Sequence, residues 1–211
     1  MSKPATFVRV LYENKFLRLE EWEHPVTGNP WYIVRCTDSV AGILHDVVNK
    51  RVLLIRSPHI AVQTDENPTG ELITPFAGRF DRNVSPKQLC VAEGSEELGA
   101  TIPEESIIVL NNGVSMVLSV GIIPERTHLC YAQITIDQLS GHDDDTFGLA
   151  GEGEEIIRHW VSEEEFLADT YVCVDLRVYA FRLYIQNMRL KEEIRRLKAA
   201  PKTRWPNTGG M

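Results

Sequence analysis

The sequence of 211 residues contains no apolar run approaching the roughly 18–20 residues that span a bilayer, and its first residues lack the apolar core of a secretory signal. We therefore expect a cytoplasmic protein with no membrane contact. Positive charge is also in deficit, because 22 lysines and arginines face 30 acidic residues, for a formal net charge of −8. Proteins that bind nucleic acid by neutralising phosphates need the opposite balance, so nucleic acid is not an expected partner.

Cysteine pairs are absent in the spacing that binds zinc. The four cysteines are Cys36, Cys90, Cys130 and Cys173, and no Cys-x-x-Cys occurs. This argues against a zinc site made of cysteines and favours small, buried apolar side chains. The composition itself, with 43% hydrophobic and 25% charged residues, is that of a folded globule. The length predicts one domain, or one domain with an appendage.

Short segments rich in aromatic and β-branched residues predict strands, mainly in the first half of the chain. Turn residues separate them, among them the segment 25–30, which contains two prolines and a glycine. The expected strands cover residues 7–12, 16–22, 31–36, 41–48, 51–55, 71–76, 114–120, 128–136 and 156–161.

Three helices are predicted. Ser85 is expected to cap the first, because Pro86 suits the first helical position and Gln88 completes a capping box. This helix should end at Gly99. Ser162 should cap a short helix that ends at Leu167, and a long helix should cover residues 173–199. Strands and helices that do not alternate regularly indicate the α+β class.

Three carboxylates share one face of the first helix. Glu93 lies three and four positions before Glu96 and Glu97, so the three side chains are neighbours. Like charges at this spacing repel one another, and a hard divalent cation such as Mg²⁺ or Mn²⁺ would relieve the repulsion. The alternative is an acidic helix face that is simply solvated.

The sequence around these carboxylates resembles the box of the Nudix hydrolase family, G-x5-E-x7-R-E-U-x-E-E-x-G-U, where U is a bulky apolar residue. Gly78, Glu93, Glu96, Glu97 and Gly99 match at the required spacing. The preceding residues 74–77 (Thr-Pro-Phe-Ala) resemble the lead-in of the ADP-ribose and nucleotide-sugar pyrophosphatase branch, and the likeness extends over most of residues 6–185. The box departs from the pattern at three positions, which here hold Val84, Ala92 and Gly94.

The resemblance implies a Nudix α/β/α sandwich with a mixed sheet, antiparallel N-terminal strands and a long C-terminal helix. It implies an N-terminal β segment for dimerisation and substrate contact (residues 1–37) and a hydrolase domain (residues 38–172). The C-terminal helix (residues 173–199) and a tail without regular structure (residues 200–211) would follow. It also implies a homodimer formed through the N-terminal strands.

The same resemblance implies a set of functional residues. One to three Mg²⁺ ions would be held by Glu93, Glu96 and Glu97, the carbonyl of Ala77 and a loop carboxylate. The loop of residues 143–155, which is rich in acids and glycines, would supply the general base, either Glu154 or Glu152, with Glu154 preferred as a metal ligand too. Gly78 and Gly99 would be structural. The expected substrate-binding residues are Trp31, Arg35, Arg56, Arg79 and Arg126.

The implied activity is metal-dependent hydrolysis of a nucleoside diphosphate linked to a moiety X, either ADP-ribose or a nucleotide sugar, to a nucleoside monophosphate and X-phosphate. The altered box positions keep an alternative open: a Nudix domain that binds a nucleotide or a protein without hydrolysis. A third hypothesis concerns residues 173–199, where Leu176, Leu183, Leu190 and Leu197 recur every seven residues. This spacing is typical of a dimerising or partner-binding helix, although the helix could also pack on the globule.

Overall fold

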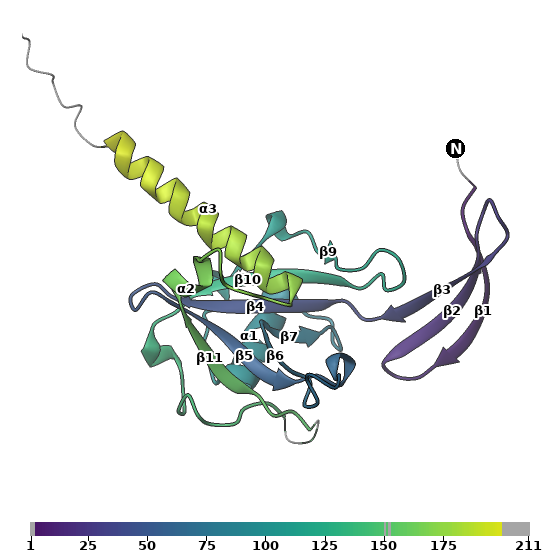
Figure 1. The fold of residues 1–211 in the computed structure, drawn as a ribbon, viewed down its shortest axis with the longest axis horizontal. Coiled ribbons are helices and arrows are strands. Elements are labelled where there is room, and N and C mark those ends of the chain that lie inside the picture. Colours follow the sequence, from purple (N-terminus) through teal and green to yellow (C-terminus); the bar gives the residue numbers. More distant parts are fainter. Residues whose placement is uncertain (1–2, 150, 152, 200–211) are drawn as a thin grey trace, which may run out of the picture.

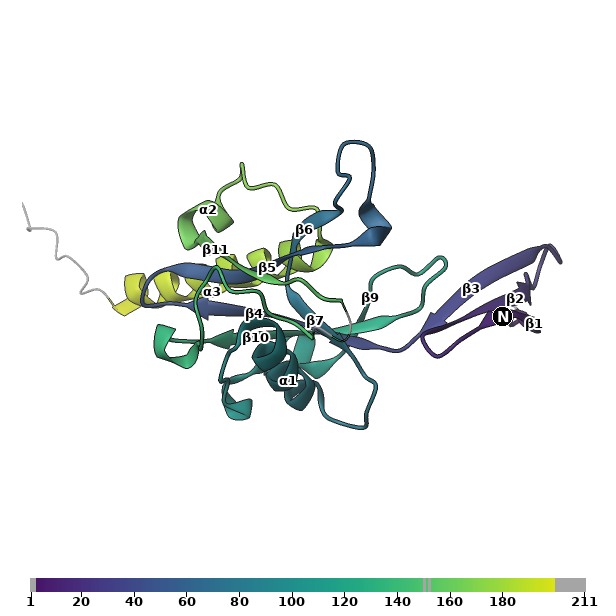
Figure 2. The same cartoon turned by 90° about the horizontal axis from the view of Figure 1, so that it is seen from below.

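The computed structural model describes residues 3–149, 151 and 153–199. It forms a central body with a small sheet projecting at one end and a long helix at the other (Figure 1). The small sheet consists of β1 (Thr6–Glu13), β2 (Leu17–Glu23) and β3 (Pro30–Cys36), which pair antiparallel in that order. In both views it projects from one end of the central body (Figure 2). Its contacts with the body include a hydrogen bond of 2.9 Å from the Val34 amide to the Ile122 carbonyl.

The central body is built on a sheet of eight strands. The main path runs β11-β5-β4-β10-β8, while β6, β7 and β9 pair with β5, β4 and β10 respectively. Among the strand pairs of this sheet that the structure describes, only β4–β10 is parallel, so the sheet is mixed. The strand bounds are β4 (Ser39–Asp46), β5 (Arg51–Pro58), β6 (Glu71–Thr74), β7 (Phe76–Arg79), β8 (Ile108–Val109), β9 (Met116–Val117), β10 (Arg126–Gln133) and β11 (Ile157–Ser162).

Helices cover both faces of this sheet. All eight residues of β4 are buried, and alternate side chains enter two separate apolar cores. Val40 and Leu44 pack on one face with α1 (Pro86–Leu98). Ala41 and Ile43 pack on the other face, against α2 (Glu163–Leu167) and the first half of α3 (Leu176–Ala199). Because successive side chains of β4 point to opposite faces of the sheet, this one strand contributes residues to both cores. Short 3-10 turns lie at Ile60–Val62, Glu104–Ser106, Asn111–Gly113 and Ile136–Gln138.

The sequence signals for the first helix are confirmed in detail. The Ser85 hydroxyl accepts a hydrogen bond from the Gln88 amide, and the Gln88 side chain accepts one from the Ser85 amide. The helix ends before Gly99, whose φ of 57° lies in the left-handed region that favours glycine. The predicted cap at Ser162 is also present.

Three expected elements differ in the structure. The single strand predicted at residues 71–76 is two strands, because Pro75 offers no amide hydrogen bond and the chain passes from β5 to β4 at this point. The strand predicted at 114–120 is reduced to β9, and the short strand β8 had no clear sequence signal. Helix α3 begins at Leu176 rather than Cys173, since Asp175 accepts the amide hydrogen of Arg177 in the first turn.

The leucine row of α3 does not pack on the globule. The buried residues of α3 are Val178, Phe181, Arg182 and Ile185. By contrast, Leu176, Leu183, Leu190 and Leu197 are all exposed. From Arg189 onward every described residue is exposed, and this part of α3 extends beyond the body (Figure 1). The first half of α3 therefore packs on the globule, which was the alternative to a partner-binding helix. It does so through Val178, Phe181, Arg182 and Ile185 and not through the leucines.

The predicted α+β class, with an antiparallel N-terminal sheet, a mixed sheet and a C-terminal helix, is confirmed. The expected boundary between residues 37 and 38 falls between β3 and β4, although the division into domains stays a prediction. The predicted tail at 200–211 lies outside the described residues. Among the helices that the structure describes, none is long and apolar enough to cross a membrane.

Candidate functional site

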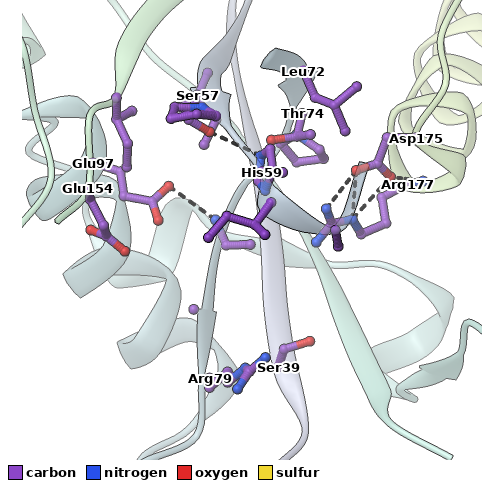
Figure 3. Close-up of a pocket in the computed structure, with 18 of the residues that line it drawn as sticks. Ser39, Ser57, His59, Leu72, Thr74, Arg79, Glu97, Glu154, Asp175 and Arg177 are labelled. Carbon is purple, nitrogen blue, oxygen red and sulfur yellow. Dashed lines mark hydrogen bonds and ion pairs between the residues drawn. The ribbon is translucent and has the colours of Figure 1, made fainter. Parts of the chain in front are cut away.

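A cavity of about 1160 Å³ opens between the sheet, the loop before β11 and the start of α3. Ala77, Gly78, Arg79, Glu97 and Glu154, all singled out in the sequence, line it. Figure 3 shows Glu97 and Glu154 on one side of this cavity and Asp175 with Arg177 on the other. The cavity is large enough for a nucleotide-sized ligand.

Glu97 is the most constrained of the acidic residues here. It is buried near the end of α1, and its Oε2 accepts a hydrogen bond of 3.2 Å from the Ala77 amide in β7. Burial is the main cause that raises the pKa of Glu97, and the charges of Glu93 and Glu154 raise it further, to about 8. Near neutral pH the Glu97 carboxyl is therefore mostly protonated in the metal-free protein.

Glu93 lies one turn earlier and packs against the glycine of the predicted box. A Cβ atom on Gly78 would lie 1.9 Å from Oε1 of Glu93, so only glycine leaves room for this carboxylate. Burial raises the pKa of Glu93, and the charges of Glu96 and Glu154 add to it, bringing it to about 7. The structural role predicted for Gly78 thus has a steric basis, which is the close approach of a carboxylate to the backbone.

Glu154 reaches the same region from the loop before β11. Its Oε2 accepts a hydrogen bond of 3.1 Å from the Leu149 amide. The loop is fastened to α1, because the Gly148 amide donates to the carbonyl of Glu96 at 3.2 Å. Glu152, the other predicted base, lies outside the described residues.

The carboxylates are suitable ligands for a divalent cation, but their side chains do not converge on one point. Glu93, Glu97 and Glu154 supply the oxygen donors that Mg²⁺ prefers, and their mutual repulsion favours a bound cation. Within the described residues, however, no three acidic, histidine or cysteine side chains converge closely enough to hold a metal. Glu96 is exposed on α1. The donor set therefore fits such a cation in its chemistry, and movement of side chains would be needed to complete it.

The predicted substrate-binding residues divide into two groups. Arg79 lines the cavity, whereas Arg35, Arg56, Arg126 and Trp31 are not among its lining residues. Arg35 donates to the buried carboxylate of Glu20 in the N-terminal sheet, and Arg126 donates to Ser115. Arg56 lies 4.0 Å from Glu71. Arg35 and Arg126 thus have hydrogen-bond partners within the chain, whereas Nε of Arg56 is buried without one among the described residues. Contact of these arginines with substrate stays a prediction.

Trp31 is on β3, where its ring stacks on His24 with centroids 5.3 Å apart. Its indole N–H donates to the Gly121 carbonyl at 3.2 Å. Trp31 is 45% exposed. A stacking role for Trp31 would therefore serve a ligand outside the cavity of its own chain.

The wall opposite the carboxylates holds residues that the sequence patterns did not reveal. Asp175 and Arg177 form a salt bridge of 2.6 Å at the start of α3, across the cavity from Glu97 and Glu154 (Figure 3). Ser57 on β5 hydrogen-bonds His59, just after the strand, at 3.1 Å, and both residues also line the cavity. Burial lowers the pKa of His59, and the positive charge of Arg177 lowers it further. No motif contains these residues, because they come together only through the fold.

No protein-family model matches the chain, and no curated protein matches it either.

Proposed function

We propose that this protein is a Nudix-type hydrolase that cleaves the pyrophosphate of a nucleoside diphosphate linked to a moiety X, ADP-ribose or a nucleotide sugar, to a nucleoside monophosphate and X-phosphate. The observation that supports this most strongly is that the buried carboxylate of Glu97 lines a large cavity, with the half-buried carboxylate of Glu93 one turn earlier in α1. This arrangement raises the pKa of both groups. Burial of like charges without their counter-charge costs stability, so it favours a function that supplies a cation. The mixed sheet between helices agrees with the fold that the box resemblance implies.

In this proposal Glu93, Glu97, Glu154, Glu96 and the Ala77 carbonyl would hold Mg²⁺ or Mn²⁺, which neutralises phosphate charge and polarises the phosphoryl oxygens when bound. Glu154 would accept the proton of the attacking water, as its place on a loop facing α1 allows. Arg79 lines the same cavity and would contact phosphate through charge-assisted hydrogen bonds.

The test is release of a nucleoside monophosphate from a panel of ADP-ribose and nucleotide sugars, with and without Mg²⁺. Glu97→Gln should abolish Mg²⁺-dependent product formation, whereas Glu105→Gln, on an exposed turn away from the cavity, should leave it unchanged. Lack of turnover across the panel, with metal present and the wild-type protein folded, would refute the proposal.

A second candidate function is binding of a nucleotide or a protein without hydrolysis. It is favoured by the lack of three converged metal donors in the described part of the chain, and by Val84 and Ala92 at altered box positions. Its signature is a melting temperature that rises with added nucleotide, persists in Glu93→Gln and is accompanied by no product.

We further propose that a second copy of this chain covers the N-terminal sheet. All eight residues of β1 are exposed, among them Phe7, Val8, Val10, Leu11 and Tyr12. A small sheet with so much apolar surface in water is marginal by itself. Pairing of two such sheets in a homodimer would bury this surface and bring Trp31 toward another subunit.

A further inference from the structure

Arg158 occupies an unusual place for an arginine, between α1 and the loop that leads to Glu154. It belongs to β11, and its side chain is only 1% exposed. Its Nε and Nη2 donate to the Leu98 carbonyl at the end of α1, at 3.0 and 2.5 Å. Nη2 also donates to the Ser140 carbonyl, and Nη1 lies 3.5 Å from Oδ1 of Asp143. One guanidinium therefore connects three separate segments.

The electrostatics of this contact are favourable. The last carbonyls of α1 form the negative end of the helix dipole, and a buried cation there is stabilised by charge-assisted hydrogen bonds. Ser140 contributes two further bonds of 2.9 Å to the Gly99 carbonyl, one from its amide and one from its hydroxyl. The start of the loop is thus held against the end of the helix that contains Glu93 and Glu97.

The contacts continue from Arg158 to Glu154. The guanidinium carbon lies 4.4 Å from the ring centroid of Phe147. Phe147 is paired with Ile156 through two backbone hydrogen bonds, of 2.8 and 3.2 Å, and these close the loop of residues 148–155 at its base. Arg158 therefore contacts the base of the loop that contains Glu154.

We propose that Arg158 is a positioning residue that sets the place of Glu154 relative to Glu93 and Glu97. The expected loss of activity rests on the hydrolase function proposed above, whereas the expected effect on the position of the loop does not. Lys87 is the sole base within Pro86–Leu98, and position 92 holds alanine. The positive charge that joins α1 to the loop is instead the guanidinium of Arg158 on β11. It binds the Leu98 carbonyl, which is 60 residues away in the chain.

The test compares two buried arginines that bind carbonyls in the same way. Arg182 on α3 is buried as well, and it donates to the carbonyls of Ala168 and Leu167 and approaches Asp169 at 3.4 Å. It lies on the opposite face of the sheet from α1. Arg182→Met therefore serves as the matched control for Arg158→Met, and Arg158→Lys keeps the charge without the planar fork.

Amide hydrogen exchange gives a readout that does not depend on activity. Arg158→Met and Arg158→Lys should speed exchange in residues 147–156 about tenfold or more, whereas Arg182→Met should leave that segment as in the wild type. Unchanged exchange in residues 147–156 of the Arg158 variants would overturn the proposal. If Arg158→Met does not fold, Arg158→Lys is judged by the same criterion.

Kinetics add a second readout, measured below the melting temperatures of all variants. Displacement of a catalytic group by about 1 Å can cost on the order of 100-fold, so both Arg158 variants should lose about 10- to 100-fold in kcat with KM changed less than about threefold. An equal loss in Arg182→Met would show a general effect of destabilisation and overturn the proposal. Absence of turnover in the wild type would count against the hydrolase alone, because hydrogen exchange still decides the role of Arg158.

Discussion

The carboxylate of Glu97 in α1 accepts a hydrogen bond from the backbone amide of Ala77 in β7, at 3.2 Å. The two residues are 20 positions apart in the chain, and this bond fixes the end of the helix to the strand beside the cavity. A bond from an amide stabilises the ionised carboxylate, but burial and the neighbouring carboxylates outweigh it. The raised pKa of Glu97 is therefore a property of the metal-free protein that can be measured.

The first prediction concerns the pH dependence of stability without metal. The pKa of Glu97 is about 8 in the folded protein, against an ordinary value of 4.5, so the folded state binds more protons than the unfolded state between these values. The contribution of Glu97 to stability is greatest below pH 4.5 and is lost as pH rises to about 8. Each pKa unit is worth about 1.4 kcal/mol.

Glu97→Gln removes this ionisation. In a chelator, the variant should gain stability over the wild type progressively from pH 5 to pH 8, measured by urea denaturation at each pH. The difference between the two proteins isolates Glu97 from the histidines, whose pKa values are lowered by burial and change stability in the opposite direction. A difference that does not depend on pH would contradict the prediction.

The second prediction tests the close approach of Glu93 to the backbone. Gly78→Ala would place a Cβ 1.9 Å from Oε1 of Glu93, so the carboxylate must move away from its position beside β7. We expect the stabilisation of the protein by Mg²⁺, measured as a shift in melting temperature, to be lost or strongly reduced.

Gly121→Ala is the matched control, because no described heavy atom beyond Gly121 and its two chain neighbours lies within 4 Å of the added Cβ. It should keep the wild-type response to Mg²⁺. Equal responses of Gly78→Ala and the wild type would show that the position of Glu93 does not matter for metal binding.

The third prediction concerns the N-terminal sheet. Val8 and Val10 are exposed on β1, and the double substitution Val8→Glu with Val10→Glu places charges on the surface that a second copy would cover. Light scattering should give the mass of a dimer for the wild type and of a monomer for the variant.

Helix α3 provides the control for this experiment. Leu190→Glu with Leu197→Glu changes the exposed leucines at the opposite end of the molecule (Figure 1). This variant should remain a dimer if the N-terminal sheet is the interface. If it becomes a monomer while the β1 variant stays dimeric, α3 is the dimerising element.

The fourth prediction concerns Trp31, which is exposed and does not line the cavity of its own chain. Stacking of a base on an aromatic ring is worth about 1–3 kcal/mol. Trp31→Ala should therefore raise KM for a nucleotide substrate about tenfold or more with little change in kcat. Val26→Ala, in the exposed turn between β2 and β3, is a suitable control for general damage to β1–β3, and an equal effect in both variants would argue against stacking by Trp31.

The sequence was sufficient for features set by local interactions. The first helix was predicted from Ser85 to Gly99, because a capping box, a proline in the first turn and a terminal glycine act within a few residues. The grouping of the α1 carboxylates was also predicted, since spacing on a helix fixes which side chains are neighbours. Gly78 was singled out only by the resemblance to the Nudix box, and its close approach to Glu93 is seen only in the fold.

Only the tertiary structure decided where the remaining residues lie. Arg35 and Arg126 donate to Glu20 and Ser115, and their contact with substrate stays a prediction. Asp175 and Arg177 line the cavity without belonging to any motif. The leucine repeat of α3 predicted a dimerising or partner-binding helix, which stays a prediction, and the structure shows that α3 packs on the globule through Val178, Phe181, Arg182 and Ile185 while the leucines are exposed. Arg158 reaches α1 across about 60 residues of sequence. Such contacts depend on which faces the sheet buries and which strands pair, and local sequence does not encode either.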